Sequence, residues 1–290
     1  MTVFVVLHYL VYDETVKCVD SILNNIRGDK RVVIVDNCSP NDSFIRLKSK
    51  FDNNDTVDII LNESNSGYAS GINLGYSYTK ERYEPDFIVC MNNDMEILQE
   101  EFIDNIEAAF GAYRFYVLGP DIYSISRHLH QNPDKDEIRT PEDVEQHIRD
   151  IKKIQNSRLK LKIKGMFYGI RPLRNLYYVL NSRPGEKRVM ENVVLHGSCF
   201  ILSGLFIKKR DYALNPGTFM YCESQILDYE CMRDGMLSIY YPFVEIMHYE
   251  DVATDAAGGS YEERLMKKCD RVLESLYFMK DMMLKDSGVI

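Results

Sequence analysis

The sequence lacks the long apolar segments that mark membrane-spanning and secreted chains. The apolar run near its start, residues 2–11, contains His8, follows no basic residue and is too short to cross a bilayer. We therefore expect neither a signal peptide nor a transmembrane helix. The seven cysteines are odd in number and form no C-x-x-C pair, and H-E-x-x-H is absent. This pattern favours reduced thiols in the cytoplasm and argues against a structural zinc site.

Phosphate-loop motifs are also missing. No G-x-G-x-x-G follows the first apolar run and G-x-x-x-x-G-K-[ST] occurs nowhere, which disfavours dinucleotide-dependent oxidoreductases and P-loop enzymes. The formal net charge of −9 argues against a general nucleic-acid binder, so no nucleic-acid partner is expected. With 290 residues, 45% hydrophobic and 27% charged, the chain has the composition of one large α/β domain or two smaller ones.

One basic segment departs from the acidic average. Residues 149–188 hold twelve Lys and Arg against two acidic residues, a charge of +10 that leaves −19 for the rest of the chain. One interpretation is a solvated helical face. The apolar and aromatic residues between these cations favour a second interpretation, a surface that contacts anionic lipid or phosphate. A third is a module that binds a partner enzyme.

The first half alternates short β-branched runs with helical periodicity. Strands are predicted at residues 3–7, 31–35, 57–61, 86–91 and 115–118, and helices at residues 13–25, 69–79 and 100–110. Near-continuous apolar strands between helices predict a mostly parallel sheet that is covered on both faces.

The alternation stops at residue 124, and the chain is polar and then basic up to residue 188. Regular structure is predicted to resume with strands at 193–202 and 238–247, a helix at 224–233 and a terminal helix at 261–284.

Polar residues follow several of the predicted strands. They are His8 and Tyr9, Asp36 and Asn37, residues 62–67, and Asn92, Asn93 and Asp94. Ligands of open parallel sheets bind at the carboxyl ends of the strands. A carboxylate after the second strand can bind a ribose or base, and an Asn and Asp pair after the fourth suits Mg²⁺ or Mn²⁺ held together with substrate phosphates. Each Asp also has an alternative interpretation as a turn former.

Three motifs in order carry a family resemblance. V-V-I-V-D-N-C-S-P-N-D-S (32–43), N-E-S-N-S-G-Y-A-S-G-I-N-L-G (62–75) and F-I-V-C-M-N-N-D-M-E-I (87–97) resemble the family 2 glycosyltransferases of the GT-A fold. The blocks L-H-G-S-C-F-I-L (195–202), G-T-F-M-Y-C-E-S (217–224) and 239–249 resemble the acceptor side of that family. Within that family, the N-N-D form at 92–94 and the long acceptor-side insertion resemble bacterial enzymes of surface polysaccharides such as capsule.

The resemblance implies an α/β, GT-A type Rossmann-like, mostly parallel sheet flanked by helices, with a basic helical insertion and a C-terminal helix. The implied segments are a nucleotide-sugar half at 1–123, the insertion at 124–190, an acceptor half at 191–255 and the helix at 256–290. The insertion and the terminal helix lie outside the resemblance.

Site residues on the donor side follow from the same resemblance. Tyr9 and Asp36 match positions that hold the base and ribose, and Asn65 and Gly67 match a loop that closes over the nucleoside. Asn92, Asn93 and Asp94 stand at the D-x-D type motif, where Asp94 would bind the Mn²⁺ or Mg²⁺ that bridges the diphosphate.

The catalytic base is assigned to Glu223, since inverting transfer needs a carboxylate that takes the acceptor proton. The family has an E-D or E-E pair here, and this chain departs from it with Ser224. Asp228 is the reserve candidate. The alternative for Glu223 is a first-turn charge that favours the helix dipole.

Three further residues complete the implied site. His248 would reach the metal or diphosphate, with a structural histidine as the alternative, and His196 and Gly197 would shape the acceptor side.

We therefore expect an inverting hexosyltransferase that moves a sugar from a UDP or dTDP sugar to a hydroxyl of a glycan or lipid-linked saccharide. It would work in the cytoplasm, with peripheral contact through 149–188 to the inner face of the membrane. The alternatives are a catalytically weak nucleotide-sugar or lipid-binding scaffold, and a nucleotidyltransferase, for which Lys17, Lys30 and Arg31 form no phosphate-binding loop.

Overall fold

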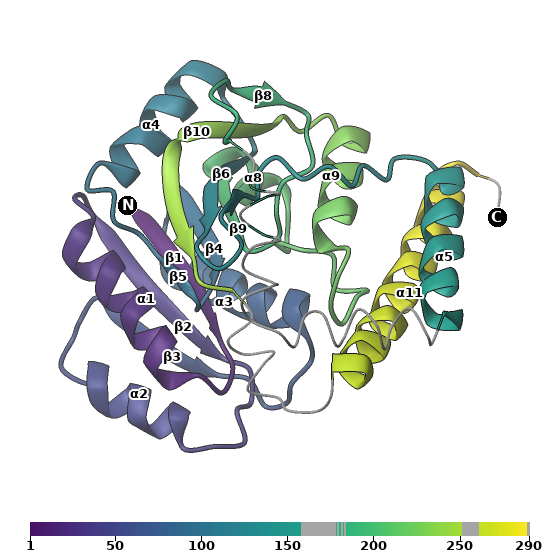
Figure 1. The fold of residues 1–290 in the computed structure, drawn as a ribbon. Helices are drawn as coiled ribbons and strands as arrows, with labels where there is room; N and C mark the ends of the chain where they lie inside the picture. Colours follow the sequence, from purple (N-terminus) through teal and green to yellow (C-terminus); the bar gives the residue numbers. More distant parts are fainter. Residues whose placement is uncertain (158–177, 179, 181, 183, 251–260, 289–290) are drawn as a thin grey trace.

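The apolar runs of the chain form the strands of one mixed sheet (Figure 1). The computed structural model describes residues 1–157, 184–250 and 261–288, together with residues 178, 180 and 182. Its strands are β1 (Thr2–His8), β2 (Lys30–Asp36), β3 (Val57–Leu61), β4 (Phe87–Asn92), β5 (Met95–Glu96), β6 (Val117–Ser124), β7 (Leu129–His130), β8 (Met190–Glu191), β9 (Cys199–Ser203) and β10 (Ser238–His248). The main order is β3-β2-β1-β4-β9-β6-β10-β5, while β7 pairs with β6 and β8 pairs with β10.

Helices cover both faces of this sheet. The described helices are α1 (Tyr12–Asn25), α2 (Ser43–Phe51), α3 (Tyr68–Arg82), α4 (Phe102–Tyr113), α5 (Pro141–Asn156), α8 (Gly204–Lys209), α9 (Glu223–Arg233) and α11 (Tyr261–Asp286). Of these, α5 and α11 lie beside the sheet and not on one of its faces. Alternate residues of β1 enter different cores: Phe4 and Val6 pack with α1, α2 and α4, whereas Val3 and Val5 pack with α3, α8 and α9. The prediction of a mostly parallel sheet that is covered on both faces is confirmed.

The register of the parallel strands sets the position of the site. In β1 and β2, His8 lies opposite Asp36, and in β1 and β4, Leu7 lies opposite Asn92. The carboxyl ends of β1, β2 and β4 therefore meet at one edge of the sheet. The polar residues that follow these strands are brought together there.

The structure differs from the predicted elements in helix α2, which the sequence did not predict, and in the start of β9. Helix α2 has only three buried residues in nine, so the sequence carries too few periodic apolar positions there to predict a helix. The predicted strand 193–202 begins only at Cys199. The residues before it are held by irregular contacts instead: Val194 O accepts from Asp134 N at 2.9 Å, and His196 N donates to Asn132 Oδ1 at 2.6 Å.

The segment predicted as a basic insertion joins the sheet at both ends, through β7 and β8. Between them, α5 begins at a capping box in which Thr140 and Asp143 satisfy each other's backbone N–H groups. Residues 158–177, with six of the twelve cations of the basic segment, lie outside the described residues. The predicted segment boundaries remain a prediction.

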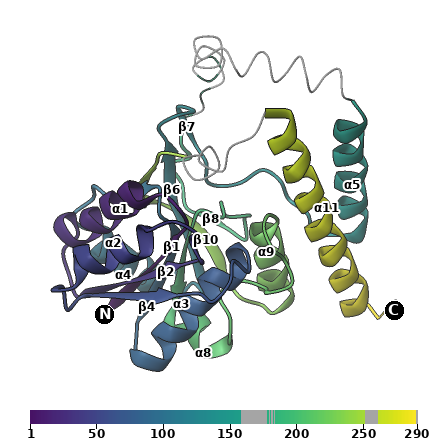
Figure 2. The ribbon, with the colours of Figure 1, turned by 90° about the horizontal axis from the view of Figure 1, so that it is seen from below.

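The terminal helix α11 is confirmed, and it lies beside α5 at one side of the sheet (Figure 2). A third apolar cluster fills the space between α5, α11 and α9. It contains Val144, Ile148, Ile226, Leu276, Met279 and Met283.

Close packing of α3 on the sheet generates a test of the fold. A Cβ at Gly75 would lie 2.4 Å from Val5 Cγ1 and 2.7 Å from Val35 Cγ2, whereas one at Gly111 of α4 would contact nothing within 4 Å. We expect Gly75→Ala to lower the free energy of unfolding by about 1–3 kcal/mol through overpacking. Gly111→Ala should raise it by about 0.5–1 kcal/mol, because Ala is the better helix former. Urea denaturation measures both, and equal effects would contradict the packing described.

Candidate active site

Asp36 ends β2 in a closed polar environment. Its Oδ1 accepts from Ser39 N at 2.7 Å, and its Oδ2 lies 3.5 Å from His8 Nε2 without a hydrogen-bond partner among the described residues. Burial raises the pKa of Asp36, and burial also lowers the pKa of His8 to about 4. The side chain of Asp36 is fully buried. A ligand therefore reaches Oδ2 only if the residues that cover it move.

A buried polar chain connects this end of β2 with the loop after β4. His8 Nε2 lies 2.8 Å from Ser43 Oγ, and His8 Nδ1 lies 2.6 Å from Thr15 Oγ1. Asn93 Nδ2 donates to the same Thr15 hydroxyl at 2.8 Å. The structure thus gives Asn93 a partner inside the protein. Thr15 and Ser43 were missed from the sequence, since short hydroxyl side chains give no motif of their own.

The loop after β3 is shaped by amide side chains and one glycine. Asn65 Oδ1 accepts from Gly67 N at 3.2 Å, and Asn37 Nδ2 donates to both Asn65 Oδ1 at 3.2 Å and Gly67 O at 3.1 Å. Gly67 has φ +95°, and a Cβ there would lie 2.1 Å from Phe219 O. Only glycine fits this close approach. Asn65 and Gly67 thus set the loop, while Tyr9 lies half-buried at the neighbouring end of β1.

Asp94 and His248 lie against each other at the edge where β5 and β10 pair. Asp94 Oδ1 is 3.3 Å from His248 Nε2, and it has no hydrogen-bond partner within the described ranges. Tyr249 N donates to Asp94 O at 2.9 Å and fixes the backbone. Asn92, which ends β4, is held by its N–H to Ser198 O at 2.9 Å. The structure therefore unites the two residues predicted to bind a metal.

Gln131 determines which nitrogen of His248 carries the proton. Its Nε2 donates to Glu250 Oε1, a carboxylate that can only accept, so its Oε1 faces His248 Nδ1 at 2.7 Å. Nδ1 is then the donor, and in the neutral ring Nε2 presents a lone pair toward Asp94 Oδ1. Two electron-pair donors that face each other fit a cation. Gln131 lies after β7, in the segment outside the family motifs, and no sequence signal identified it.

The number of protein ligands indicates which metal ion the site could hold. In the part of the chain that the structure describes, no group of three or more His, Cys, Asp or Glu side chains converges as a metal site. Asp94 and His248 would supply two ligands. Mg²⁺ characteristically keeps its remaining positions for substrate phosphates and water.

His196 and Gly197 lie between these two residues and α9. Burial lowers the pKa of His196 to about 3, and its ring packs edge-on against His248 with centroids 6.0 Å apart. Gly197 O accepts from Tyr68 OH at 2.8 Å, and a Cβ at Gly197 would lie 2.9 Å from Ser224 Oγ. The backbone at Gly197 thus bridges α3 and the start of α9.

Glu223 is the first residue of α9, and it is a half-buried acid with one carboxylate oxygen that lacks a partner among the described residues. Its Oε1 is buried without a hydrogen bond from any described residue, and burial raises its pKa to about 7. Tyr221 and Cys222, which precede it, have φ of 77° and 63°. Such left-handed conformations cost roughly 1 kcal/mol or more per non-glycine residue. The chain therefore holds a poorly solvated carboxylate on a strained turn, as expected of a functional group.

Tyr68 places Glu223 and Asp94 in one neighbourhood. Burial raises the pKa of Tyr68, and the negative charges of Glu223 and, more weakly, Asp94 add to this effect. Both carboxylates therefore lie close enough to Tyr68, at the start of α3, to act on its hydroxyl.

Asp228, the reserve base, has a structural partner. Its Oδ2 accepts from Arg139 Nε at 3.1 Å, and Arg139 Nη2 donates to Asn192 O at 2.6 Å. Burial raises the pKa of Asp228. Asp228 Oδ1, like Glu223 Oε1, is buried without a hydrogen bond from any described residue. The ion pair with Arg139 nevertheless gives Asp228 a structural role, because it ties α9 to the segment before α5, and the geometry therefore favours Glu223 as the base.

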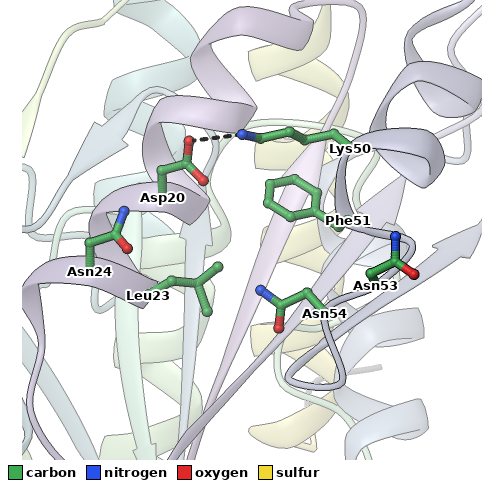
Figure 3. Close-up of a pocket in the computed structure, with 7 residues that line it drawn as sticks. All are labelled: Asp20, Leu23, Asn24, Lys50, Phe51, Asn53 and Asn54. Atoms are coloured by element: carbon green, nitrogen blue, oxygen red, sulfur yellow. Dashed lines mark ion pairs between the residues drawn. The ribbon is translucent and has the colours of Figure 1, made fainter.

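An open depression of about 280 Å³ lies elsewhere, between α1 and α2 (Figure 3). Asp20 and Lys50 form an ion pair of 3.6 Å across it. It lies toward the amino ends of the strands and contains none of the predicted site residues. The candidate site therefore does not depend on it.

Comparison with known proteins shows the family of this chain. The model of glycosyl transferase family 2 matches residues 3–178. The chain belongs to glycosyl transferase family 2. This family 2 transferase is 22% identical over 245 residues to the low-salt glycan biosynthesis hexosyltransferase Agl10 of Haloferax volcanii, with 84% of this chain and 67% of Agl10 covered. It is therefore a glycosyltransferase.

Solved structures share its fold. Staphylococcus aureus TarS is 13% identical with a TM-score of 0.54, over 86% of this chain and 36% of that chain. GalNAc-T7, crystallised with UDP, GalNAc and Mn²⁺, is also 13% identical with a TM-score of 0.54, over 86% of this chain and 43% of that one. TarS residues 1–349 were crystallised in complex with UDP. The family 2 transferase thus spans less than half of these two longer chains.

The burial of Glu223 generates a stability prediction. Its carboxyl pKa lies above the unfolded value, so the folded state loses stability as the pH rises from about 4.5 through about 7. At about 1.4 kcal/mol per pKa unit, Glu223→Gln should stabilise the protein at pH 8 by an amount on the order of 3 kcal/mol, and by little at pH 4.5. Thermal and urea unfolding at both pH values measure this.

Glu142, an exposed acid in the first turn of α5, provides the control. Glu142→Gln should have only a small effect, of about 0.3–1 kcal/mol and destabilising. If Glu223→Gln also destabilises at pH 8, Glu223 acts as a helix-dipole charge and its assignment as the base is wrong.

Proposed function

We propose that this chain is an inverting glycosyltransferase. It moves a sugar from a nucleoside diphosphate sugar to a hydroxyl of a glycan or lipid-linked saccharide in surface polysaccharide synthesis. The observation that carries the proposal concerns Asp36, Asp94 and Glu223. Each of these three acids has one buried oxygen for which the described residues provide no hydrogen bond. Buried polar atoms are rarely left unsatisfied, so such atoms at one edge of a sheet favour a site completed by ligands.

The donor would lie across the carboxyl ends of β1, β2 and β4. Asp36 and Tyr9 would bind the ribose and base, and the loop with Asn65 and Gly67 would close over the nucleoside. UDP is the favoured nucleotide over dTDP, since TarS and GalNAc-T7 were both crystallised with UDP. Asn92 and Asn93 would hold the backbone of the diphosphate-binding loop in place.

Asp94 Oδ1 and His248 Nε2 would hold a divalent cation, Mn²⁺ or Mg²⁺, together with the diphosphate. Their 3.3 Å approach, with the proton of His248 fixed on Nδ1 by Gln131, supports this assignment. When bound, such an ion supplies positive charge that stabilises the leaving diphosphate. The Mn²⁺ in the GalNAc-T7 structure agrees with this choice.

Glu223 would act as the general base. An acceptor hydroxyl near His196 and Gly197 gives its proton to the Glu223 carboxylate while its oxygen bonds to the anomeric carbon. The bond from that carbon to the diphosphate oxygen breaks, and both bonding electrons leave with the nucleoside diphosphate. Attack opposite the leaving group inverts the anomeric configuration. A carboxyl pKa of about 7 suits a base that works near neutral pH.

Peripheral contact with the inner face of a cytoplasmic membrane is proposed for the basic segment 149–188. Its described part includes the exposed side chains of Lys152 and Lys153 on α5. Among the residues with a described placement, no helix is both long and apolar enough to span a bilayer. Contact would therefore depend on cations and aromatic residues at the surface.

Nucleotide binding tests the proposal. UDP with Mn²⁺ at about 100 times its Kd should raise the melting temperature by about 5 °C, since binding at that level adds about 2.7 kcal/mol. Asp94→Asn should lose the part of this shift that depends on Mn²⁺. Thermal-shift measurements with UDP, dTDP, GDP and CDP, with and without Mn²⁺, also identify the nucleobase that the donor site prefers.

Asp104→Asn is the matched control, because Asp104 is an exposed acid on α4. It should respond to UDP and Mn²⁺ as the wild type does. The donor site is assigned wrongly if none of the four nucleotides shifts the wild type, or if Asp94→Asn retains the full response to Mn²⁺.

A further inference from the structure

Helix α11 contacts the turn that carries Glu223. We define residues 217–223 as the catalytic loop. We propose that α11 is a positioning element for Glu223, with Ser275 and Arg271 as its principal contacts. The inference rests on the proposed role of Glu223 and adds to it residues outside the family motifs.

A buried hydrogen bond fixes the middle of the loop. Ser275 Oγ donates to Met220 O at 3.1 Å, and Ser275 is only 2% exposed. Met220 lies three residues before Glu223. This contact therefore fixes the loop backbone at the residue directly before the strained pair Tyr221 and Cys222.

Two cations of α11 lie over aromatic rings of the same loop. The Arg271 guanidinium carbon is 4.4 Å from the centre of the Phe219 ring, and Lys268 Nζ is 5.3 Å from that of Tyr221. Cation–π contacts of this kind attract the ring to the helix. Further along α11, the Phe278 ring occupies the space beside Gly217, where a Cβ would lie 2.0 Å from it.

The other side of the catalytic loop rests on the donor side of the site. Phe219 O accepts from Tyr68 N at 2.7 Å, at the start of α3. Gly67 allows that carbonyl to approach. Phe219 is thus held between α3 and α11. The position of α11 therefore determines how the loop meets the donor-binding edge of the sheet.

The backbone of the loop needs such support. Tyr221 and Cys222 are consecutive non-glycine residues with positive φ. Conformations of this kind persist only where the surroundings hold them. The α11 contacts fall on Phe219, Met220 and Tyr221, that is, just before this pair and on its first member, and Glu223 follows the pair directly. Without the α11 contacts, the turn would relax and the Glu223 carboxylate would move away from the acceptor.

Turnover separates positioning from simple stability. The probe reaction is UDP release in water from whichever of UDP-glucose, UDP-galactose and UDP-N-acetylglucosamine the wild type hydrolyses fastest. We expect Ser275→Ala to lower kcat about tenfold while the Kd for UDP with Mn²⁺ stays within twofold. Ser275→Thr, which keeps the hydroxyl, should restore most of kcat. Arg271→Ala should also lower kcat. Because Arg271 is an exposed side chain, this variant should still fold.

Met283→Ala is the control for stability. Met283 is a buried residue of α11, about two turns beyond Ser275. It takes part in none of the contacts described with the loop. The variant should lower the melting temperature but keep kcat within twofold when assayed well below it. Backbone amide exchange at residues 219–223 should accelerate about tenfold in Ser275→Ala and remain unchanged in Met283→Ala.

The outcomes separate the two proposals. If Glu223→Gln keeps the turnover of the wild type, the base is assigned wrongly, whatever the α11 variants do. If Glu223→Gln abolishes turnover while Ser275→Ala and Arg271→Ala stay within twofold of wild type, α11 has no positioning role. An equal loss of kcat in Met283→Ala would also overturn the positioning role of α11, because global destabilisation would then explain the loss of kcat in Ser275→Ala.

Discussion

The pairing of β10 with β5 and β6 is the constraint on which the rest of the site depends. His248 lies opposite Met95 in β5 and opposite Ser124 in β6, at the end of β10. This register brings His248 to Asp94, although the two are far apart in the sequence. A slip of one residue would turn the His248 side chain to the other face of the sheet. The approach of His248 to Asp94 is therefore set by strand register.

Unsatisfied polar atoms at the site have a common physical explanation. Asp36, Asp94 and Glu223 each keep an oxygen that the described part of the protein leaves without a hydrogen bond. Each costs stability in the absence of a ligand. The cost is tolerated because apolar packing on both faces of the sheet, and the third cluster under α9, holds these residues in place. The rule that buried polar atoms are hydrogen-bonded is thus broken where a ligand is expected to complete the structure.

Much of the fold was predictable from the sequence, because buried strands such as β1 and β4 are apolar runs of the right length. Asp94 and Glu223 were predicted as site residues through motifs that resemble the family. Gln131 and Ser275 were not, since their roles depend on tertiary contacts across 117 residues to His248 and 55 residues to Met220. The start of β9 was also placed too early, because apolar residues before Cys199 are buried without pairing as a strand.

The most direct test of the account is a crystal structure with UDP and Mn²⁺, with anomalous diffraction data recorded near the manganese absorption edge. The account predicts the strongest anomalous peak between Asp94 Oδ1 and His248 Nε2, with His248 Nδ1 still donating to Gln131. A Mn²⁺ bound away from both side chains, or a His248 whose Nε2 donates to another protein group, would contradict it.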